Sequence, residues 1–121
     1  MPKPRNSLRL AGLPDMIARL WSAQTTPALA ESYLQHFEQA VQPQLGKIPG
    51  FLGFTVSTRP SPSTVEILVT TYWQSFSAID SFAGADRDSA VVAEEAAAFL
   101  GDYDKRVRHY EVALSQFPPR S

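Results

Sequence analysis

The residues best suited to acid–base chemistry in this chain are His109 and its neighbours in sequence. His109 is one of only two histidines in 121 residues, and it lies within a predicted strand at residues 105–114. Alternation along that strand places His109 and Glu111 on one face, where the carboxylate can hold the imidazole in one tautomer and leave it to act as a base. A structural histidine, bonded across strands, fits the same residues, so both interpretations remain open.

Arg19 is the second candidate for catalysis. It lies in the middle of a predicted first strand, on the same face as Trp21. If the first and last strands are neighbours with matching faces, Arg19, His109 and Glu111 converge on one patch. A guanidinium there would stabilise an anionic oxygen, such as an enolate or a phenolate. An ion pair between Arg19 and Glu111 across the strands is the alternative.

Aromatic residues supply candidate substrate-binding surfaces. Trp21 and Trp73 are large and flat, so they suit the walls of a pocket for an aromatic ligand, or equally the filling of a core. Tyr72 and Tyr110 carry hydroxyls that would hydrogen-bond a substrate or reach water at an edge. We interpret His36, on the first predicted helix, as a surface residue.

Composition excludes several kinds of function. There is no cysteine, so disulfides, thiolate nucleophiles and Cys-zinc sites are ruled out. The two histidines are far apart and lack metal-ligand spacing, and there is no Gly-rich phosphate loop, so we expect no metal and no cofactor. A net charge of -1 predicts no nucleic-acid or membrane partner. The cysteine-free composition is compatible with a cytoplasmic location, which we expect.

The strands are predicted from apolar alternation and β-branched content, and they occupy residues 16–24, 51–59, 64–73 and 105–114. Residues 1–15 are expected to form an N-terminal arm, which is loosely held or packs on a partner through its leucines. Residues 16–114 form the domain, and residues 115–121 form a C-terminal tail.

Three helices are predicted between these strands. Thr26 caps the first, which runs to about Gln44 and is disturbed by Pro43. Ser75 caps the second, which Gly84 ends. The third runs from Asp88 or Ser89 to Leu100, and its acidic residues are interpreted as a solvated face.

The resulting order, β-α-β-β-α-α-β, predicts a ferredoxin-like α+β fold. Two split β-α-β units with right-handed crossovers give one four-stranded antiparallel sheet in the order 4-1-3-2. The helices cover one face of this sheet, while the other face keeps large apolar side chains. An uncovered apolar face of that size calls for a partner, so we expect a homodimer.

Several short segments resemble the dimeric α+β barrel superfamily, which includes the antibiotic biosynthesis monooxygenases. They follow one another in order over residues 16–114, and they are Met16–Trp21, Pro49-Gly50-Phe51, Trp73-x-Ser75 with Ala78, Phe82-Ala83-Gly84 and His109-Tyr110-Glu111-Val112. The resemblance implies a cofactor-independent monooxygenase that binds a small aromatic or apolar molecule between sheet and helices. A non-catalytic dimeric ligand-binding or stress-associated protein is the alternative, and an oligomer with a filled core and no ligand is a third possibility.

One branch of that superfamily fits poorly. Heme-degrading members use an Asn on the first strand, a Trp in the helix after the third strand and a histidine that ligates iron. Here the corresponding positions carry Arg19, Phe82 and the run of alanine and valine at residues 90–93. Because the iron ligand is missing from the place where that chemistry needs it, the resemblance does not favour heme degradation.

Overall fold

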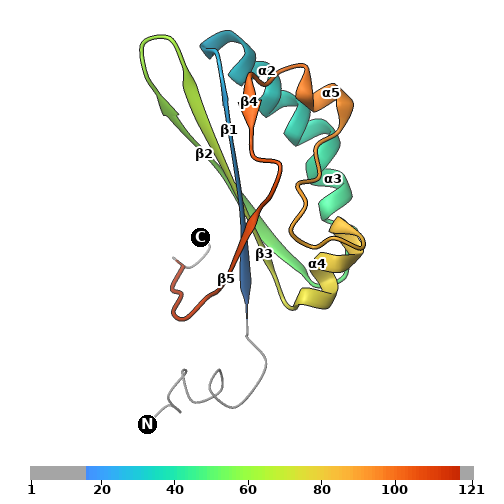
Figure 1. Ribbon diagram of the computed structural model, residues 1–121. Coiled ribbons are helices and arrows are strands. Elements are labelled where there is room, and N and C mark those ends of the chain that lie inside the picture. The colour runs from blue at the N-terminus through green and yellow to red at the C-terminus, as the bar shows by residue number, and fades with distance from the viewer. Residues whose placement is uncertain (1–15, 118–121) are drawn as a thin grey trace.

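The computed structural model describes residues 16–117, so the predicted arm at residues 1–15 and the last four residues of the predicted tail lie outside the described residues. The described chain forms one antiparallel sheet with helices on one of its faces (Figure 1). The strands are β1 (Ile17–Thr25), β2 (Phe51–Pro60), β3 (Val65–Trp73), β4 (Asp102–Tyr103) and β5 (Arg108–Glu111). The helical elements are α2 (Pro27–His36), the π-helical η1 (Phe37–Val41), α3 (Gln42–Leu45), α4 (Phe76–Ala83) and α5 (Glu94–Ala97).

The strands run in the order β2-β3-β1, with β4 and β5 both paired to the free side of β1. This confirms the predicted ferredoxin-like order. The pairing of β1 with β3 is continuous, from Ile17 opposite Trp73 to Thr25 opposite Val65. Every residue of β1 is therefore placed by a regular backbone ladder, and its odd-numbered residues all point toward the helices.

The predicted last strand, residues 105–114, is shorter in the structure: only β5, Arg108–Glu111, is extended there, and the short strand β4, Asp102–Tyr103, was not predicted. Asp104 follows β4 beside β1, and its Oδ2 accepts hydrogen bonds from the backbone N–H of Ser22 at 3.1 Å and from the Ser22 hydroxyl at 3.0 Å. The backbone after Asp104 then turns to a different partner, and the N–H of Val107 donates to the carbonyl of Asp88 at 2.8 Å.

The predicted third helix is wrong over its first half. Only α5 is helical there, and residues 84–93, which we call the strap, have no regular helix. The physical reason is a competing backbone pairing: Ala90 donates to the carbonyl of Lys105 at 2.9 Å, and Ser89 forms a bridge with Arg106. Backbone groups used in this way are not free to form helical hydrogen bonds.

The first predicted helix is disturbed just before Pro43, as the sequence predicts. Thr26 caps α2, as expected, and the chain becomes π-helical at η1 before Pro43 enters α3. Proline has no N–H to donate to the preceding turn, so the hydrogen-bond spacing widens ahead of it. The second predicted helix, α4, is confirmed with both of its caps: the Ser75 hydroxyl accepts from Ala78, and Gly84 has a φ of 84°.

Candidate functional site

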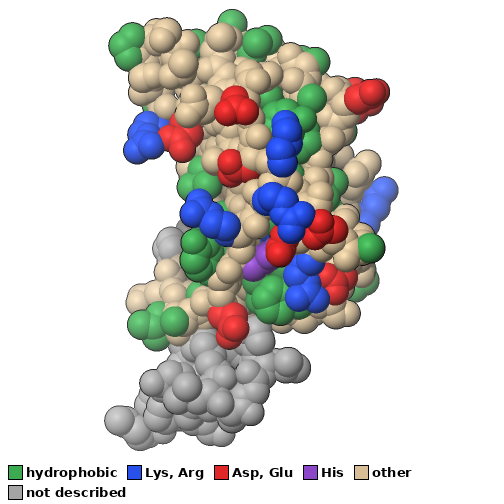
Figure 2. Space-filling view, in the orientation of Figure 1, with side chains coloured by type: hydrophobic (Ala, Val, Ile, Leu, Met, Phe, Trp, Pro, Cys, Tyr) green, Lys and Arg blue, Asp and Glu red, His purple; other side chains and the backbone are tan. Residues whose placement is uncertain are grey.

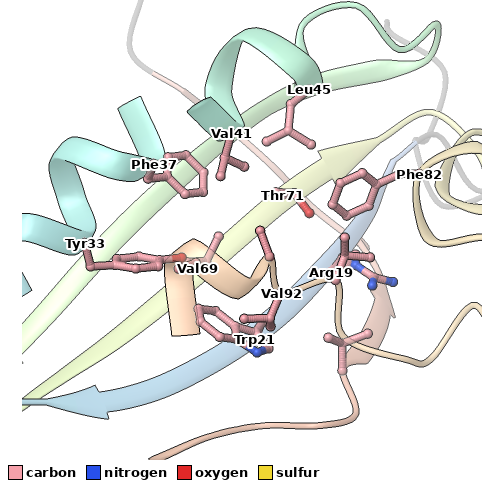
Figure 3. Close-up of a pocket in the computed structure, with 14 residues that line it drawn as sticks. Arg19, Trp21, Tyr33, Phe37, Val41, Leu45, Val69, Thr71, Phe82 and Val92 are labelled. Carbon is pink, nitrogen blue, oxygen red and sulfur yellow. The ribbon is translucent and has the colours of Figure 1, made fainter. Parts of the chain in front are cut away.

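A cavity of about 70 Å³ lies between the sheet and the helices. Its floor comes from β1 and β3, one wall from α2, η1 and α3, and the opposite wall from α4, the strap and α5 (Figure 3). The lining is mainly aromatic and aliphatic, and its members are Arg19, Trp21, Tyr33, Phe37, Val41, Leu45, Val69, Thr71, Phe82, Val91, Val92, Ala93, Ala96 and Val107. No carboxylate is among them.

Arg19 closes one end of this cavity and is the charged group of the site. It is only 4% exposed, and its guanidinium donates to the carbonyl of Arg87 at 2.7 Å and to the carbonyl of Ser89 at 2.8 Å. Its Nη1 also lies 3.0 Å from Nε2 of His109. Since a guanidinium has five N–H donors, the Nε–H and one N–H of Nη2 have no acceptor among residues 16–117. Burial lowers the pKa of Arg19 to about 10, so the group is still a cation at neutral pH.

The two partners of His109 determine its tautomer. Arg19 is always a donor, so Nε2 of His109 must accept, and the proton lies on Nδ1, which is 3.2 Å from Oδ1 of Asp88. Burial, followed by the Arg19 cation, lowers the pKa of His109 below its ordinary value of 6.5, although Asp88 acts in the other direction. His109 is therefore neutral at pH 7, and its lone pair is already engaged.

Further charges surround this pair on the surface side. Figure 2 shows blue and red side chains gathered around a histidine over the strap and the last strand. Arg87 binds Asp80 through two hydrogen bonds of 2.8 and 2.9 Å, and Arg106 binds Asp86 at 2.6 Å. The hydrogen bond from Arg87 lowers the pKa of Asp80. These pairs hold the strap against α4 and the last strand.

Two hydroxyl groups complete the polar lining of the cavity. Thr71 lies directly opposite Arg19 in the strand register, and its Oγ1 accepts a hydrogen bond from Nε1 of Trp73 at 2.8 Å. Tyr33 reaches the cavity from α2 and is 4% exposed, and burial raises the pKa of its hydroxyl to about 12. No residue between 16 and 117 accepts from or donates to that hydroxyl.

The structure brings together some of the residues predicted for the site. Arg19 and Trp21 line the cavity. His109 does not line it but contacts Arg19 from the neighbouring strand β5, as the matching faces of the first and last strands predicted. Trp73 is fully buried in the core and does not line the cavity. Its side chain fills the end of the sheet between Phe51 and Phe82.

The other predicted binding residues lie elsewhere. Tyr72 and Tyr110 are even-numbered neighbours of Trp73 and His109, so alternation turns them to the uncovered face of the sheet. Glu111 is opposite Ile17 and exposed, and within residues 16–117 it makes no ion pair with Arg19. The alternative of an Arg19–Glu111 pair is therefore wrong, because the strap carbonyls and His109 occupy the guanidinium.

His36 also requires a correction. It is half-buried rather than on the surface, with its ring centroid 6.0 Å from that of Phe99. Its Nε2 is buried and has no hydrogen-bond partner among the described residues. The cause is Phe99, just after α5, whose ring packs beside His36 on this side of α2.

Tyr33, Thr71 and Asp88 are site residues that sequence reasoning missed. Tyr33 looked like one more member of the apolar stripe of the first helix, and Asp88 like part of a solvated helix face. The signal for Thr71 was present: once the first and third strands are paired, counting along them places Thr71 opposite Arg19.

The fold and this site define a ferredoxin-like α+β protein with a cavity enclosed between its sheet and its helices. The family model described as antibiotic biosynthesis monooxygenase matches residues 16–94. The chain therefore belongs to that family, as the resemblance in sequence predicted. None of the curated proteins with which the chain was compared matches it.

Solved structures share this architecture at low sequence identity. A Bacillus cereus protein named as an antibiotic biosynthesis monooxygenase is 15% identical with a TM-score of 0.62, over 90% of this chain and 100% of that one. The monooxygenase ActVA-Orf6 of Streptomyces coelicolor, solved in complex with nanaomycin D, is 19% identical with a TM-score of 0.59, over 97% and 100%. The heme-degrader MhuD of Mycobacterium tuberculosis, solved with two hemes in its active site, is 23% identical with a TM-score of 0.54, over 83% and 99%.

Heme does not fit the cavity described here. Neither histidine lines it, so the cavity offers no imidazole to an iron atom.

Among residues 16–117, no helix has the length and apolar character needed to cross a membrane.

Proposed function

We propose that this protein is a cofactor-independent monooxygenase whose substrate is a small, electron-rich aromatic molecule with an acidic hydroxyl. The observation that carries the proposal is the buried Arg19 cation at the end of a cavity walled by aromatic side chains, with two N–H donors for which residues 16–117 provide no acceptor. A buried cation without a carboxylate beside it in the cavity favours a ligand that is, or becomes, an anion.

The reaction would use the substrate as its own reductant. An activated ring CH₂ loses one proton to His109, and Arg19 stabilises the resulting phenolate or enolate, whose negative charge is shared with that carbon. The carbon then gives its electron pair to dioxygen, and the outer oxygen takes up a proton to form a hydroperoxide. Loss of water then converts the original CH₂ and O₂ into a C=O group and H₂O, which balances atoms and electrons without a cofactor.

His109 is proposed as the group that holds Arg19 and takes up the proton. In the structure its lone pair accepts from Arg19, so it acts as a base only when a bound substrate displaces Nη1. Asp88, on the other ring nitrogen, would then stabilise the imidazolium. Because Asp88 is more than half exposed, the proton has a short route to solvent.

The cavity must enlarge to admit such a substrate. Its volume of about 70 Å³ is below the ~150 Å³ cavity that holds benzene and the ~300–1,000 Å³ of ordinary ligand pockets. The strap is the wall best able to move, because three of its residues line the cavity without belonging to a helix or strand. The phenolic ligand is therefore expected to enter beside Val91 and Val92.

A homodimer belongs to the same proposal. The sheet face away from the helices carries Leu20, Leu68 and Tyr72, and beside them Leu52 and Tyr110 are 44% and 50% exposed. Burying this face against a second copy would remove the exposed apolar surface from water. Analytical ultracentrifugation at micromolar concentration should give the mass of two chains, and a stable single chain would contradict this part.

Binding of a phenol whose phenolate absorbs at longer wavelength, such as 4-hydroxyacetophenone, tests the proposal directly. Arg19 should lower the pKa of the bound phenol, so its spectrum shifts toward the phenolate below the pKa of the free compound. The Arg19→Met variant should remove that shift, whereas Arg59→Met, which removes a solvent-exposed cation, should keep it. Oxygen uptake with oxidisable phenols and anthrone-type compounds would then identify turnover.

Binding without reaction is the second candidate, and the engaged lone pair of His109 favours it. In that case the spectral shift would be seen with every suitable phenol, but oxygen uptake would stay at the rate of the uncatalysed solution. Replacing His109 by Asn would leave that rate unchanged.

A further inference from the structure

We infer that Tyr33 is a specificity-determining residue that hydrogen-bonds a second oxygen of the ligand, at the end of the cavity opposite Arg19. This inference rests on the proposed function for the identity of the site, but its experiment has an independent readout. The inference narrows the class of ligand to a compact planar weak acid with an acceptor oxygen at each end.

The position of Tyr33 is established by its ring contacts. Its ring centroid lies 6.0 Å from that of Trp21 and 6.4 Å from that of Phe37. Figure 3 shows its hydroxyl reaching toward Val69, while the nitrogens of Arg19 lie on the other side of the view. Trp21 and Val69 form one register pair, so Tyr33 meets the floor at that pair.

Strand geometry gives the spacing of the two floor positions that lie beneath the polar ends. Arg19 and Thr71 are also a register pair, two residues along the strands from Trp21 and Val69. Two residues of antiparallel strand span roughly 6–7 Å, which is about the length of one aromatic ring. This spacing favours a ligand with oxygens at its opposite ends over one with neighbouring oxygens.

Ring packing alone does not explain why Tyr33 carries a hydroxyl group. Tyr33 is almost completely buried as a residue, and within the described chain its hydroxyl makes no hydrogen bond, although its oxygen is not among the fully buried polar atoms that lack a partner. The oxygen therefore opens on the cavity that Tyr33 lines, and Tyr in a core that needs only its ring is replaceable by Phe. The hydroxyl is neutral at any physiological pH, so it can donate to a carbonyl or accept from a hydroxyl.

The other polar groups complete an asymmetric pattern. At the far end, Thr71 already accepts from Trp73, so its hydroxyl hydrogen remains to be donated beside the cation. Trp21 points its only donor at the carbonyl of Asp104 and so contributes only its ring face to the cavity. An ionised oxygen therefore fits the Arg19–Thr71 end, and a neutral oxygen fits the Tyr33 end.

Three matched phenols test the inference by equilibrium binding to the full-length protein. They are 4-hydroxyacetophenone, with a para carbonyl; 3-hydroxyacetophenone, with the carbonyl displaced; and 4-ethylphenol, without it. The para ketone should bind more tightly than the other two. Tyr33→Phe should weaken its binding about 10-fold, as the loss of one buried hydrogen bond predicts, and leave the affinities for 3-hydroxyacetophenone and 4-ethylphenol unchanged. Part of the preference over 4-ethylphenol remains in the variant, because an acyl group makes the phenol more acidic and Arg19 favours its anion.

Tyr103→Phe is the matched control, because Tyr103 flanks Trp21 with a centroid distance of 6.2 Å but does not line the cavity. It should keep the preference. A Tyr33→Phe protein whose affinity for the para ketone is unchanged would overturn the inference, as would equal binding of all three phenols by the unsubstituted protein. Failure of all three to bind would count against both proposals.

The two proposals fail separately. If Arg19→Met leaves the phenolate shift intact, the proposed role of Arg19 is wrong, while the para preference still reports on Tyr33. If the shift disappears in Arg19→Met but Tyr33→Phe changes nothing, the anion site stands and the inference about Tyr33 does not.

Discussion

The floor and the strap wall of the cavity are held by different kinds of interaction. The floor is the β1–β3 pair, in which nine consecutive residues of one strand face nine of the other. The strap is held by single side chains and a short backbone pairing: Arg19 binds two of its carbonyls, His109 binds Asp88, and the segment at residues 105–107 pairs with residues 88–90. Two more exposed ion pairs, Arg87–Asp80 and Arg106–Asp86, add to these contacts.

This difference decides which parts respond to a single substitution. A backbone ladder does not depend on any one side chain, so the floor loses stability mainly through lost packing. The strap depends on one guanidinium for two of its hydrogen bonds, and the same guanidinium faces the ligand. An anion that engages Arg19 therefore competes with the contacts that hold the cavity closed.

Trp73→Ala should have the largest effect, and it tests the floor. The side chain is fully buried against Phe51 and Phe82, and its loss leaves a cavity, so the free energy of unfolding should fall by about 3–5 kcal/mol. Denaturant titration measures this. Trp73→Phe, which retains most of the packing, should cost clearly less; equal losses would mean that packing does not hold the floor.

Arg19→Met should release the strap while the floor stays intact. The substitution removes three hydrogen bonds to partly buried groups, which is expected to cost about 2–4 kcal/mol locally and to speed opening by roughly 30- to 1,000-fold. Amide exchange at Ala90 and Val107, which donate across the strap contact, measures the opening, and trypsin cleavage after Arg87 reports it independently.

Amides of β3 provide the internal reference for that experiment. If they exchange faster by the same factor as Ala90, Arg19 supports the whole domain rather than the strap. Arg59→Met is the matched cation control, since Arg59 pairs with Glu66 at the exposed far end of the sheet and should change neither set of amides.

The floor could be predicted from sequence, and the strap could not. Alternation in three strands fixed the register of Arg19 and Trp21, and Thr26, Ser75 and Gly84 marked helix boundaries through side chains that act locally. The strap depends on carbonyls that bind an arginine some 70 residues away. Every residue type has a backbone carbonyl, so no local sequence pattern marks the strap carbonyls that bind Arg19. The alanine-rich stretch predicts a helix instead.

Gly84→Ala tests the start of the strap against a glycine of β2, the strand beside the floor. Gly84 has a φ of 84° and a ψ of -153°, a region that residues with a Cβ rarely occupy, so alanine should cost about 1–3 kcal/mol. Gly53 of β2 has open space around its missing Cβ and no such φ, so Gly53→Ala should be neutral or slightly stabilising. Thermal and denaturant unfolding of both variants measures the difference; equal effects would show that the Gly84 conformation is not constrained.

Acid should weaken the strap before it affects the floor. The pKa of His109 is lowered in the folded state, so between that pKa and 6.5 the unfolded chain binds more protons, and stability falls as pH decreases below about 6.5. The slope from one such group is at most about 1.4 kcal/mol per pH unit. His109→Asn should flatten the curve in this window. A separate loss begins below about 3.8, where the unfolded chain takes up a proton that folded Asp80, its pKa lowered by Arg87, does not yet bind. Amide exchange at Ala90 between pH 5 and 7, corrected for the intrinsic rate, should follow the same titration.

If the His109→Asn variant keeps the full slope of stability against pH, the titrating group is not His109. The contact between His109 and Arg19 then does not set the acid response of the strap.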